Sequence, residues 1–172
     1  MKTQVALSLI LLAAAVGLGG CSDSSPTAPD TAGGQQNGAT LHTTVTFKAV
    51  VVHNDGDLIG KGEFEFYFRV NKNSAFRSVT LGTGDAWDPG RIFWTVTGAG
   101  SEVKVGFEAT EWDVNLIGKD VPDKDMDSRS ATRSFSVPSS PSASPKEYSI
   151  TLGNDNCKVQ VYYELSTWAS ED

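Results

Sequence analysis

A strict alternation of residue character in residues 62–70 constrains the fold of this chain more than any other feature. In this stretch, GEFEFYFRV, every second residue is a large apolar one: Phe64, Phe66, Phe68 and Val70. Successive side chains of a β-strand point to opposite faces, whereas a helix would scatter these four residues around its circumference. The stretch is therefore predicted to be a strand with one buried and one solvated face.

The same period of two recurs from about residue 41 onward, and no stretch shows a sustained helical period. Strands are expected at residues 44–52, 62–70, 76–81, 91–97, 102–110, 131–137, 147–152 and 158–165. Because each strand keeps one wet face, the pattern predicts an all-β fold, an antiparallel two-sheet β-sandwich of about eight strands. A closed barrel of eight strands is the alternative, and the long acidic stretch after residue 110 disfavours its regular strand lengths.

The first 40 residues have a different character. Lys2 precedes an apolar run at residues 5–16, which is too short for a membrane-spanning helix, since such a helix needs about 20 residues. The run ends in Leu-Gly-Gly-Cys at Cys21, and a segment rich in Ser, Thr, Pro and Gly follows it. We expect a secretory signal peptide at residues 1–20, a flexible tether at 21–40 and a β-sandwich domain at 41–172.

The Leu-Gly-Gly-Cys sequence resembles the lipobox of bacterial lipoproteins. The resemblance implies cleavage before Cys21, acylation of its thiol (by palmitate, for example) and a lipid anchor in the bacterial cell envelope. Ser22, where an Asp would signal retention at the inner membrane, favours the outer membrane. An ordinary signal peptide that happens to carry a cysteine is the alternative.

The charge balance and the motifs bound the function classes. Lys and Arg number 14 against 21 Asp and Glu, for a net charge of −7, so nucleic-acid binding lacks its usual electrostatic term. The chain has two histidines, His42 and His53, and no nucleophile elbow, HExxH or phosphate-binding glycine loop. We therefore expect no enzymatic activity, with a carboxylate-dependent hydrolase as the less favoured alternative.

Two further residue types have a structural interpretation. Cys157 borders an alternating apolar run, where a cysteine is expected to be buried and inert. The four tryptophans are expected to pack in the core or at turns rather than to form a platform for sugars; they are Trp87, Trp94, Trp112 and Trp168.

Two acidic clusters lie between predicted strands. The first is HNDGDLIGKGE at residues 53–63, and the second runs from residue 111 to 127; both contain Leu-Ile-Gly-Lys. Residues 108–127 hold seven carboxylates against two lysines. Like charges at this density repel one another unless a cation lies among them, and Ca²⁺ takes six to eight oxygen ligands. Ca²⁺ is therefore the favoured ion and Mg²⁺ the second; a solvated acidic surface is the alternative.

The sequence DVNLIGKD at residues 113–120 resembles the third calcium loop of C2 domains, the β-sandwiches that bind calcium and phospholipid, and the first cluster is similar to their first calcium loop. Glu63-Phe64 stands where the family has Asp-Pro, and Asn115 where it has an Asp. The resemblance implies these calcium ligands: Asp55, Asp57, Glu63, Asp113, Asn115, Asp120 and Asp123.

Together these features predict a lipid-anchored envelope lipoprotein whose C2-like domain binds calcium and serves as a binding or structural module. Partners of the acidic loops would be anionic lipid, glycan or protein. Since acyl chains already supply the membrane anchor, a structural or ligand-presenting calcium site is favoured over calcium-triggered recruitment to a membrane. An envelope interaction protein with no metal site is the alternative.

Overall fold

The computed structural model describes residues 38–56, 61–114, 120–122, 126 and 128–171, and for residues 113, 114 and 120–122 the backbone alone. These described residues form ten strands. They are β1 (Thr40–Asp55), β2 (Gly62–Val70), β3 (Asn73–Leu81), β4 (Ala86–Trp87), β5 (Ile92–Thr97), β6 (Glu102–Val114), β7 (Asp120–Pro122), β8 (Arg129–Ser136), β9 (Lys146–Gly153) and β10 (Cys157–Ser170).

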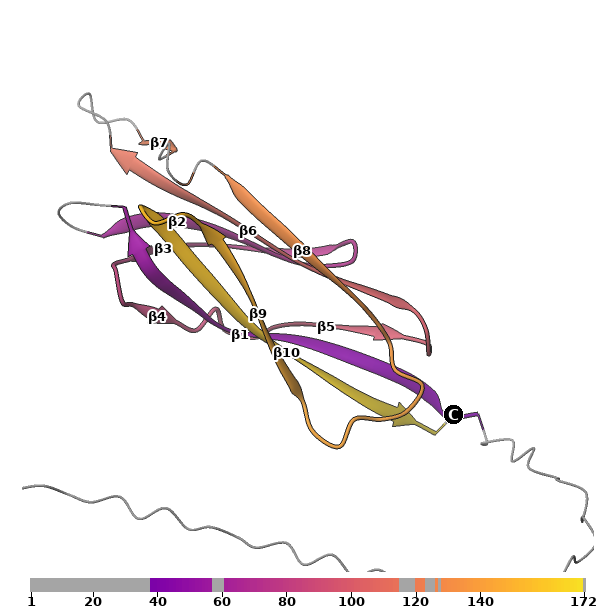
Figure 1. Ribbon diagram of the computed structural model, residues 1–172. Helices are drawn as coiled ribbons and strands as arrows, with labels where there is room; N and C mark the ends of the chain where they lie inside the picture. Colours follow the sequence, from indigo (N-terminus) through magenta and orange to yellow (C-terminus); the bar gives the residue numbers. More distant parts are fainter. Residues whose placement is uncertain (1–37, 57–60, 115–119, 123–125, 127, 172) are drawn as a thin grey trace, which may run out of the picture. The chain divides into compact units, whose positions relative to one another are not determined.

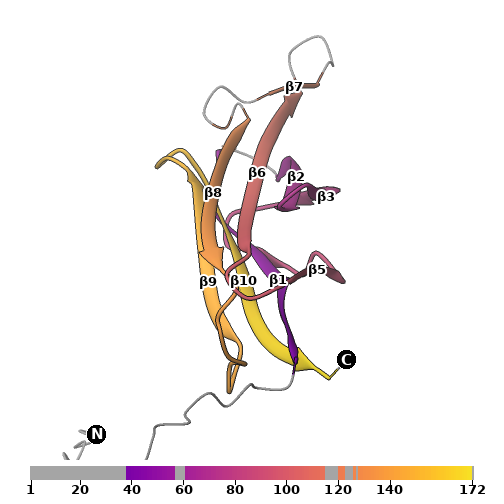
Figure 2. The ribbon, with the colours of Figure 1, turned by 90° about the vertical axis from the view of Figure 1, so that its right-hand side faces the viewer.

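The strands form two antiparallel sheets that lie face to face (Figures 1 and 2). In the first sheet, here sheet A, β1 pairs with β10 on one side and with β5 and β4 on the other, and β9 flanks β10. In the second, sheet B, the order is β3-β2-β6, and β6 also pairs with β7 and β8. The predicted antiparallel two-sheet β-sandwich is confirmed; the narrower C2-like assignment stays a prediction.

The core confirms the alternation from which the fold was predicted. Phe64, Phe66, Phe68 and Val70 are fully buried on the inner face of β2. Phe66 stacks on Phe64 and Phe107 at ring-centroid distances of 5.5 Å each. Cys157 is also fully buried, as predicted. Packing of this kind makes the two sheets one rigid support for the loops at their ends.

Several element boundaries differ from the prediction. Strand β6 runs through Val114, so residues 111–114, predicted as loop, continue a strand. Strand β1 likewise runs to Asp55, and β4 lies between the strands expected at residues 76–81 and 91–97. The short β7 lies in the predicted acidic loop and pairs with the end of β6. These strands continue beyond their apolar stretches because pairing with a neighbouring strand stabilises polar residues in a sheet as well.

The two ends of the sandwich carry different chain segments. Thr40 at the start of β1 pairs with Ser170 at the end of β10, and we call this end the entry pole. The opposite end, which we call the acidic pole, holds Asp55, Gly62, residues 82–85 and the last residues of β6 (Figure 1).

Within the described residues no helix is long and apolar enough to cross a membrane.

Candidate functional site

The pairing of β2 brings the two acidic clusters to the acidic pole. Gly62, at the start of β2, pairs with Leu81 at the end of β3, and Glu63 pairs with Trp112 near the end of β6. The first cluster joins β1 to β2, and the second follows β6. The described residues next to β1, β2 and β6 in both clusters therefore lie at the same end of the sandwich, which is a geometric requirement for any ion that both would share.

Asp55 ends β1 with its carboxylate held in place. Its side chain is buried, with 4% of the residue exposed. Its Oδ1 accepts a hydrogen bond from the hydroxyl of Thr83 at 2.8 Å, and its Oδ2 accepts one from the Thr83 backbone N–H at 3.1 Å. The Asp55 N–H in turn donates to the Thr83 hydroxyl at 3.1 Å. The carboxylate thus ties the turn between β3 and β4 to the end of β1.

Asp85 completes this arrangement, and the sequence analysis missed it. Its Oδ2 accepts hydrogen bonds from the Gly82 backbone N–H at 2.9 Å and from Lys61 Nζ at 2.7 Å. These two contacts lower the pKa of Asp85 below its ordinary value, the Gly82 hydrogen bond being the larger cause. Both donors favour the charged carboxylate. The Lys61 ammonium therefore already supplies positive charge at the acidic pole.

Glu111 is the second buried carboxylate of this pole. It lies on β6 and is completely buried, and its backbone N–H donates to the Met126 carbonyl at 3.4 Å. Its side chain faces Gly62, where an added Cβ would come within 2.7 Å of Glu111 Oε1. Glycine at position 62 therefore makes room for this carboxylate between the sheets. The alternation Val103, Val105, Phe107, Ala109 extends to Glu111, so its inward orientation could have been predicted.

Glu63 lies on the other side of β2. It is exposed, and together with Glu65, Ser78 and Trp112 it lines a shallow hollow of about 260 Å³ on the outer face of sheet B. Asp55 and Glu111, in contrast, are buried at the inner side of their strands. The structure therefore does not bring the Glu63 carboxylate together with these two, and its role as a ligand stays a prediction.

The other predicted ligands are placed only in part. Asp113 and Asp120 lie on the paired backbones of β6 and β7, where Asp113 faces Val121 and Asp120 faces Val114. Asp57, Asn115, Asp123 and the lipidation residue Cys21 lie outside the described residues. Among the residues that are described, no group of three or more His, Cys, Asp or Glu side chains is arranged to hold a metal ion.

The histidines and tryptophans take structural positions, with one exception. His53 Nε2 lies 2.8 Å from Gln160 Oε1 on the exposed face of sheet A. Trp87 stacks near Phe66, and Trp94 packs against the core, as predicted. Trp168 is 45% exposed, so the prediction that it packs in the core or at a turn is wrong. Its strand has one solvated face, and position 168 falls on it.

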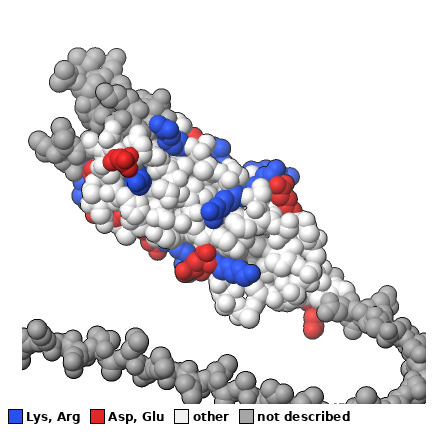
Figure 3. Space-filling model, in the orientation of Figure 1, with Lys and Arg blue, Asp and Glu red and all other residues white. Residues whose placement is uncertain are grey.

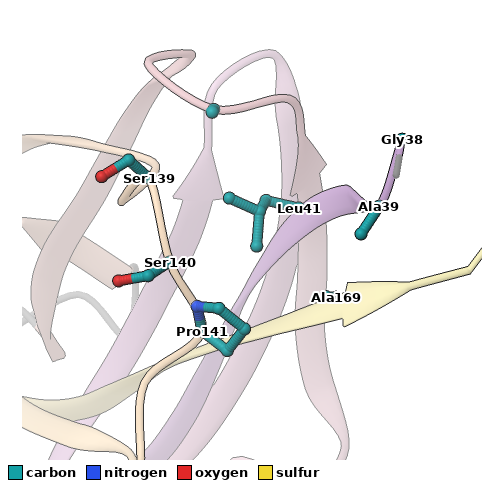
Figure 4. A pocket seen from close by; sticks show the side chains of 8 residues that line it. Gly38, Ala39, Leu41, Ser139, Ser140, Pro141 and Ala169 are labelled. Atoms are coloured by element: carbon teal, nitrogen blue, oxygen red, sulfur yellow. The ribbon is translucent and has the colours of Figure 1, made fainter. Parts of the chain in front are cut away.

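The entry pole has a hollow whose lining carries no ionisable side chain. A hollow of about 510 Å³ lies there between the start of β1, the end of β10 and the segment before β9. Figure 4 shows Leu41 between Ala39 and the stretch Ser139–Pro141. The eight residues that line it are small, apolar or hydroxyl-bearing, and none of them titrates near neutral pH. The acidic pole is therefore the better candidate site for binding an ion.

Comparisons with known proteins give little further guidance. No protein-family model matches the chain. The search of curated proteins found no match. Among solved structures, the chain has a weak similarity to human GIVD cytosolic phospholipase A2, solved in complex with methyl gamma-linolenyl fluorophosphonate and terbium chloride, with a TM-score of 0.40 and 10% identity over 78% of this chain. The matched region spans 18% of that protein's chain. The β-sandwich assignment therefore rests on the strand pairing itself.

Proposed function

We propose that this chain is a lipid-anchored protein of the bacterial cell envelope whose β-sandwich binds calcium at its acidic pole and acts as a binding or structural module. In this proposal residues 1–20 are the signal peptide, Cys21 carries the lipid, and residues 21–40 are the tether to the domain. The proposal combines the lipobox-like sequence with the chemistry of the acidic pole.

The observation that carries the calcium proposal is the burial of Asp55 and Glu111 at the pole where both acidic clusters meet. Asp55 accepts two hydrogen bonds from Thr83. Carboxylates that lie together at one end of a protein attract cations to that end. Carboxylate oxygens are the donors that Ca²⁺ prefers, so the donor set fits this ion.

A bound calcium ion would be held by Asp55 and Glu111 together with the predicted ligands of the two clusters, Asp57, Asp113, Asn115, Asp120 and Asp123. When bound, the ion would neutralise the clusters and link the ends of β1 and β6. In this proposal Asp55 also keeps the turn at Thr83 in position through its two hydrogen bonds. Such binding to the folded state alone stabilises it by mass action.

Calcium titration calorimetry on the full chain in detergent tests the metal proposal. We expect binding in the wild type and its loss or strong weakening in Asp55→Asn. Glu102→Gln is the matched control, since Glu102 is an acidic residue at the start of β6, away from the acidic pole. An absence of heat from the wild type, or equal binding in all three proteins, would reject the site.

Labelling with radioactive palmitate in a bacterial host tests the anchor separately. We expect incorporation in the wild type and none in Cys21→Ser, whereas Cys157→Ser should still incorporate label because Cys157 is buried in the core. Label in Cys21→Ser would contradict the assignment of the lipidated residue.

An envelope interaction protein with no metal site is the second candidate. The observation that favours it is the ion pair between Lys61 and Asp85 at 2.7 Å, which supplies a positive charge to the acidic pole without a metal. On the side of the molecule shown in Figure 3, basic and acidic side chains are also interspersed rather than separated. Calorimetry distinguishes the two candidates, since only the first predicts calcium binding.

A further inference from the structure

The outer face of sheet A carries most of the exposed aromatic surface of the described residues. Among the described residues, four large hydrophobic side chains are exposed. Three of them lie on this face: Phe93 (55%), Tyr162 (38%) and Trp168 (45%). The fourth, Phe76, belongs to β3 of sheet B. Aromatic rings that one sheet face leaves in water are available to stack on a ligand.

The registers of β1, β5 and β10 place these rings on the same side of the sheet. Phe93 pairs with Thr46, and Thr46 also pairs with Glu164, so Phe93 lies two strands across from a position between Tyr162 and Trp168. Tyr162 and Trp168 are six residues apart on β10, which corresponds to about 20 Å along the strand. The rings are therefore spread over the sheet and do not form one contiguous apolar patch.

Hydroxyl, amide and imidazole groups fill the space around the rings at the entry-pole end of this face. The His42 ring stacks on Trp168 with ring centroids 4.2 Å apart. His42 Nδ1 lies 3.0 Å from the Thr97 hydroxyl and Nε2 lies 2.9 Å from the Ser170 hydroxyl. These contacts join three strands and fix the orientation of the His42 ring, which in turn supports one face of the Trp168 indole.

A second polar group surrounds Tyr162. The Tyr162 hydroxyl donates to Gln160 Oε1 at 2.9 Å, and His53 Nε2 lies 2.8 Å from the same oxygen. Gln160 Nε2 donates to the Ser149 hydroxyl at 2.9 Å. Side chains held by one another lose little further conformational freedom when a ligand binds, so this face is preorganised for polar contacts.

The middle of the face balances its own charge, although the chain carries a net charge of −7. Phe93 borders a shallow hollow of about 230 Å³ that Lys48, Asp88 and Arg91 also line. Lys48 pairs with Glu164 at 3.5 Å. Glu147 on the neighbouring strand β9, which pairs with Glu164, is exposed on the same side. Two cations and three anions therefore lie around Phe93 and across β10, so this region carries little net charge, and charge complementarity favours a ligand without net charge.

We propose that the outer face of sheet A binds an extended, neutral polysaccharide, with Trp168, Phe93 and Tyr162 as stacking platforms. A pyranose ring has an apolar C–H face that packs on an aromatic ring and a rim of hydroxyls that exchange hydrogen bonds with Ser, Thr, Gln and His side chains. The observed face alternates these two kinds of surface. The distance between the rings requires a chain of several sugars rather than a monosaccharide.

Two other occupants fit this face less well. A second copy of the chain would need a contiguous, desolvated apolar centre, and here polar groups separate the rings. A lipid surface would attract a face with excess positive charge and apolar side chains at one edge, whereas this face is balanced in charge. The polysaccharide proposal is independent of calcium, because its residues lie on a sheet face and not at the acidic pole.

Affinity electrophoresis of the full chain through gels that contain hydroxyethylcellulose, xylan or laminarin tests the proposal. We expect retention by at least one of these glycans and a loss of affinity of about tenfold in Trp168→Ala. Trp168→Phe should restore most of it. Phe76→Ala is the matched control, since Phe76 is 43% exposed on the other sheet, and it should bind as the wild type does.

Retention by none of these glycans would overturn the proposal. Equal retention of the wild type, Trp168→Ala, Phe93→Ala and Tyr162→Ala would also overturn it, because binding would then lie elsewhere. Sedimentation equilibrium covers the second copy: a dimer that Trp168→Ala converts to a monomer, with no glycan retention, would assign the face to self-association. Thermal melting of each variant verifies that it is folded.

Discussion

Replacing Asp55 by Ala should destabilise the domain even without calcium. Asp55 is buried, and its two carboxylate oxygens accept hydrogen bonds from the Thr83 hydroxyl and backbone N–H. The substitution removes both acceptors. The turn at residues 82–85 keeps its backbone bonds to β1, from Val52 N–H to the Asp85 carbonyl at 3.0 Å and from Gly84 N–H to the Val52 carbonyl at 2.8 Å. The loss should therefore stay local and leave the fold intact.

The size of the effect follows from these contacts. A hydrogen bond to a charged group contributes about 1.5–3 kcal/mol. Thr83 is exposed, so water can replace the lost acceptors and the lower end of that range applies. We expect Asp55→Ala, which removes two such hydrogen bonds, to lower the free energy of unfolding by about 3 kcal/mol, and Thr83→Val, which removes one, to lower it by about 1.5 kcal/mol.

Urea unfolding in excess EGTA, followed by tryptophan fluorescence, measures these changes. The slope of the unfolding free energy with urea should be unchanged, since neither variant alters the surface exposed on unfolding. The double variant should lose less than the sum of the two single losses, because both remove the same contact. An Asp55→Ala protein within about 0.5 kcal/mol of the wild type would refute the structural role assigned to this carboxylate.

Three further predictions concern the core and the dependence on pH. Phe66→Ala should cost about 3–5 kcal/mol in urea unfolding, because it leaves a cavity among fully buried rings; a loss below about 1 kcal/mol would contradict the packing. The Gly82 N–H and Lys61 lower the pKa of Asp85 below 3.8, so the contribution of Asp85 to stability is present at neutral pH and is lost as the pH falls below that value. Lys61→Met should weaken this pH dependence in acid melting curves. An unchanged curve would contradict the role of Lys61. Burial raises the pKa of Tyr163 above 10.0. Above that pH, Tyr163 ionises more readily in the unfolded chain than in the folded one, so stability should fall. Tyr163→Phe should reduce this alkaline loss of stability, and an equal loss in the variant would contradict the prediction.

The sheets could be predicted from the sequence because the apolar residues of each strand show which of its faces is buried. The phenylalanines at 64, 66 and 68 are two residues apart, and all three are fully buried. Period-two alternation is a local property, so it requires no knowledge of the partner strands. The ends of the strands were less predictable, since β6 continues through Trp112 only because β2 and β7 pair with it there.

The acidic pole was only partly predictable for the same reason. Asp55 was identified from its cluster, but its partner Thr83 lies 28 residues away and meets it only because β4 pairs with β1. Asp85 lies between two predicted strands, and nothing in its local sequence places it beside Lys61. Trp168 was wrongly assigned to packing in the core or at a turn. It lies on a strand with one solvated face, and position 168 falls on that face.

The melting temperature of the full chain in increasing Ca²⁺ and in excess EGTA tests the proposed calcium module most directly. Binding to the folded state alone adds about 2.7 kcal/mol at a free concentration 100 times the Kd, so the melting temperature should keep rising with the logarithm of the calcium concentration. The double variant Asp113→Asn/Asp120→Asn should lose this rise, and Glu102→Gln should keep it. Equal melting temperatures in Ca²⁺ and EGTA, or a rise that the double variant retains, would contradict a calcium site at the acidic pole.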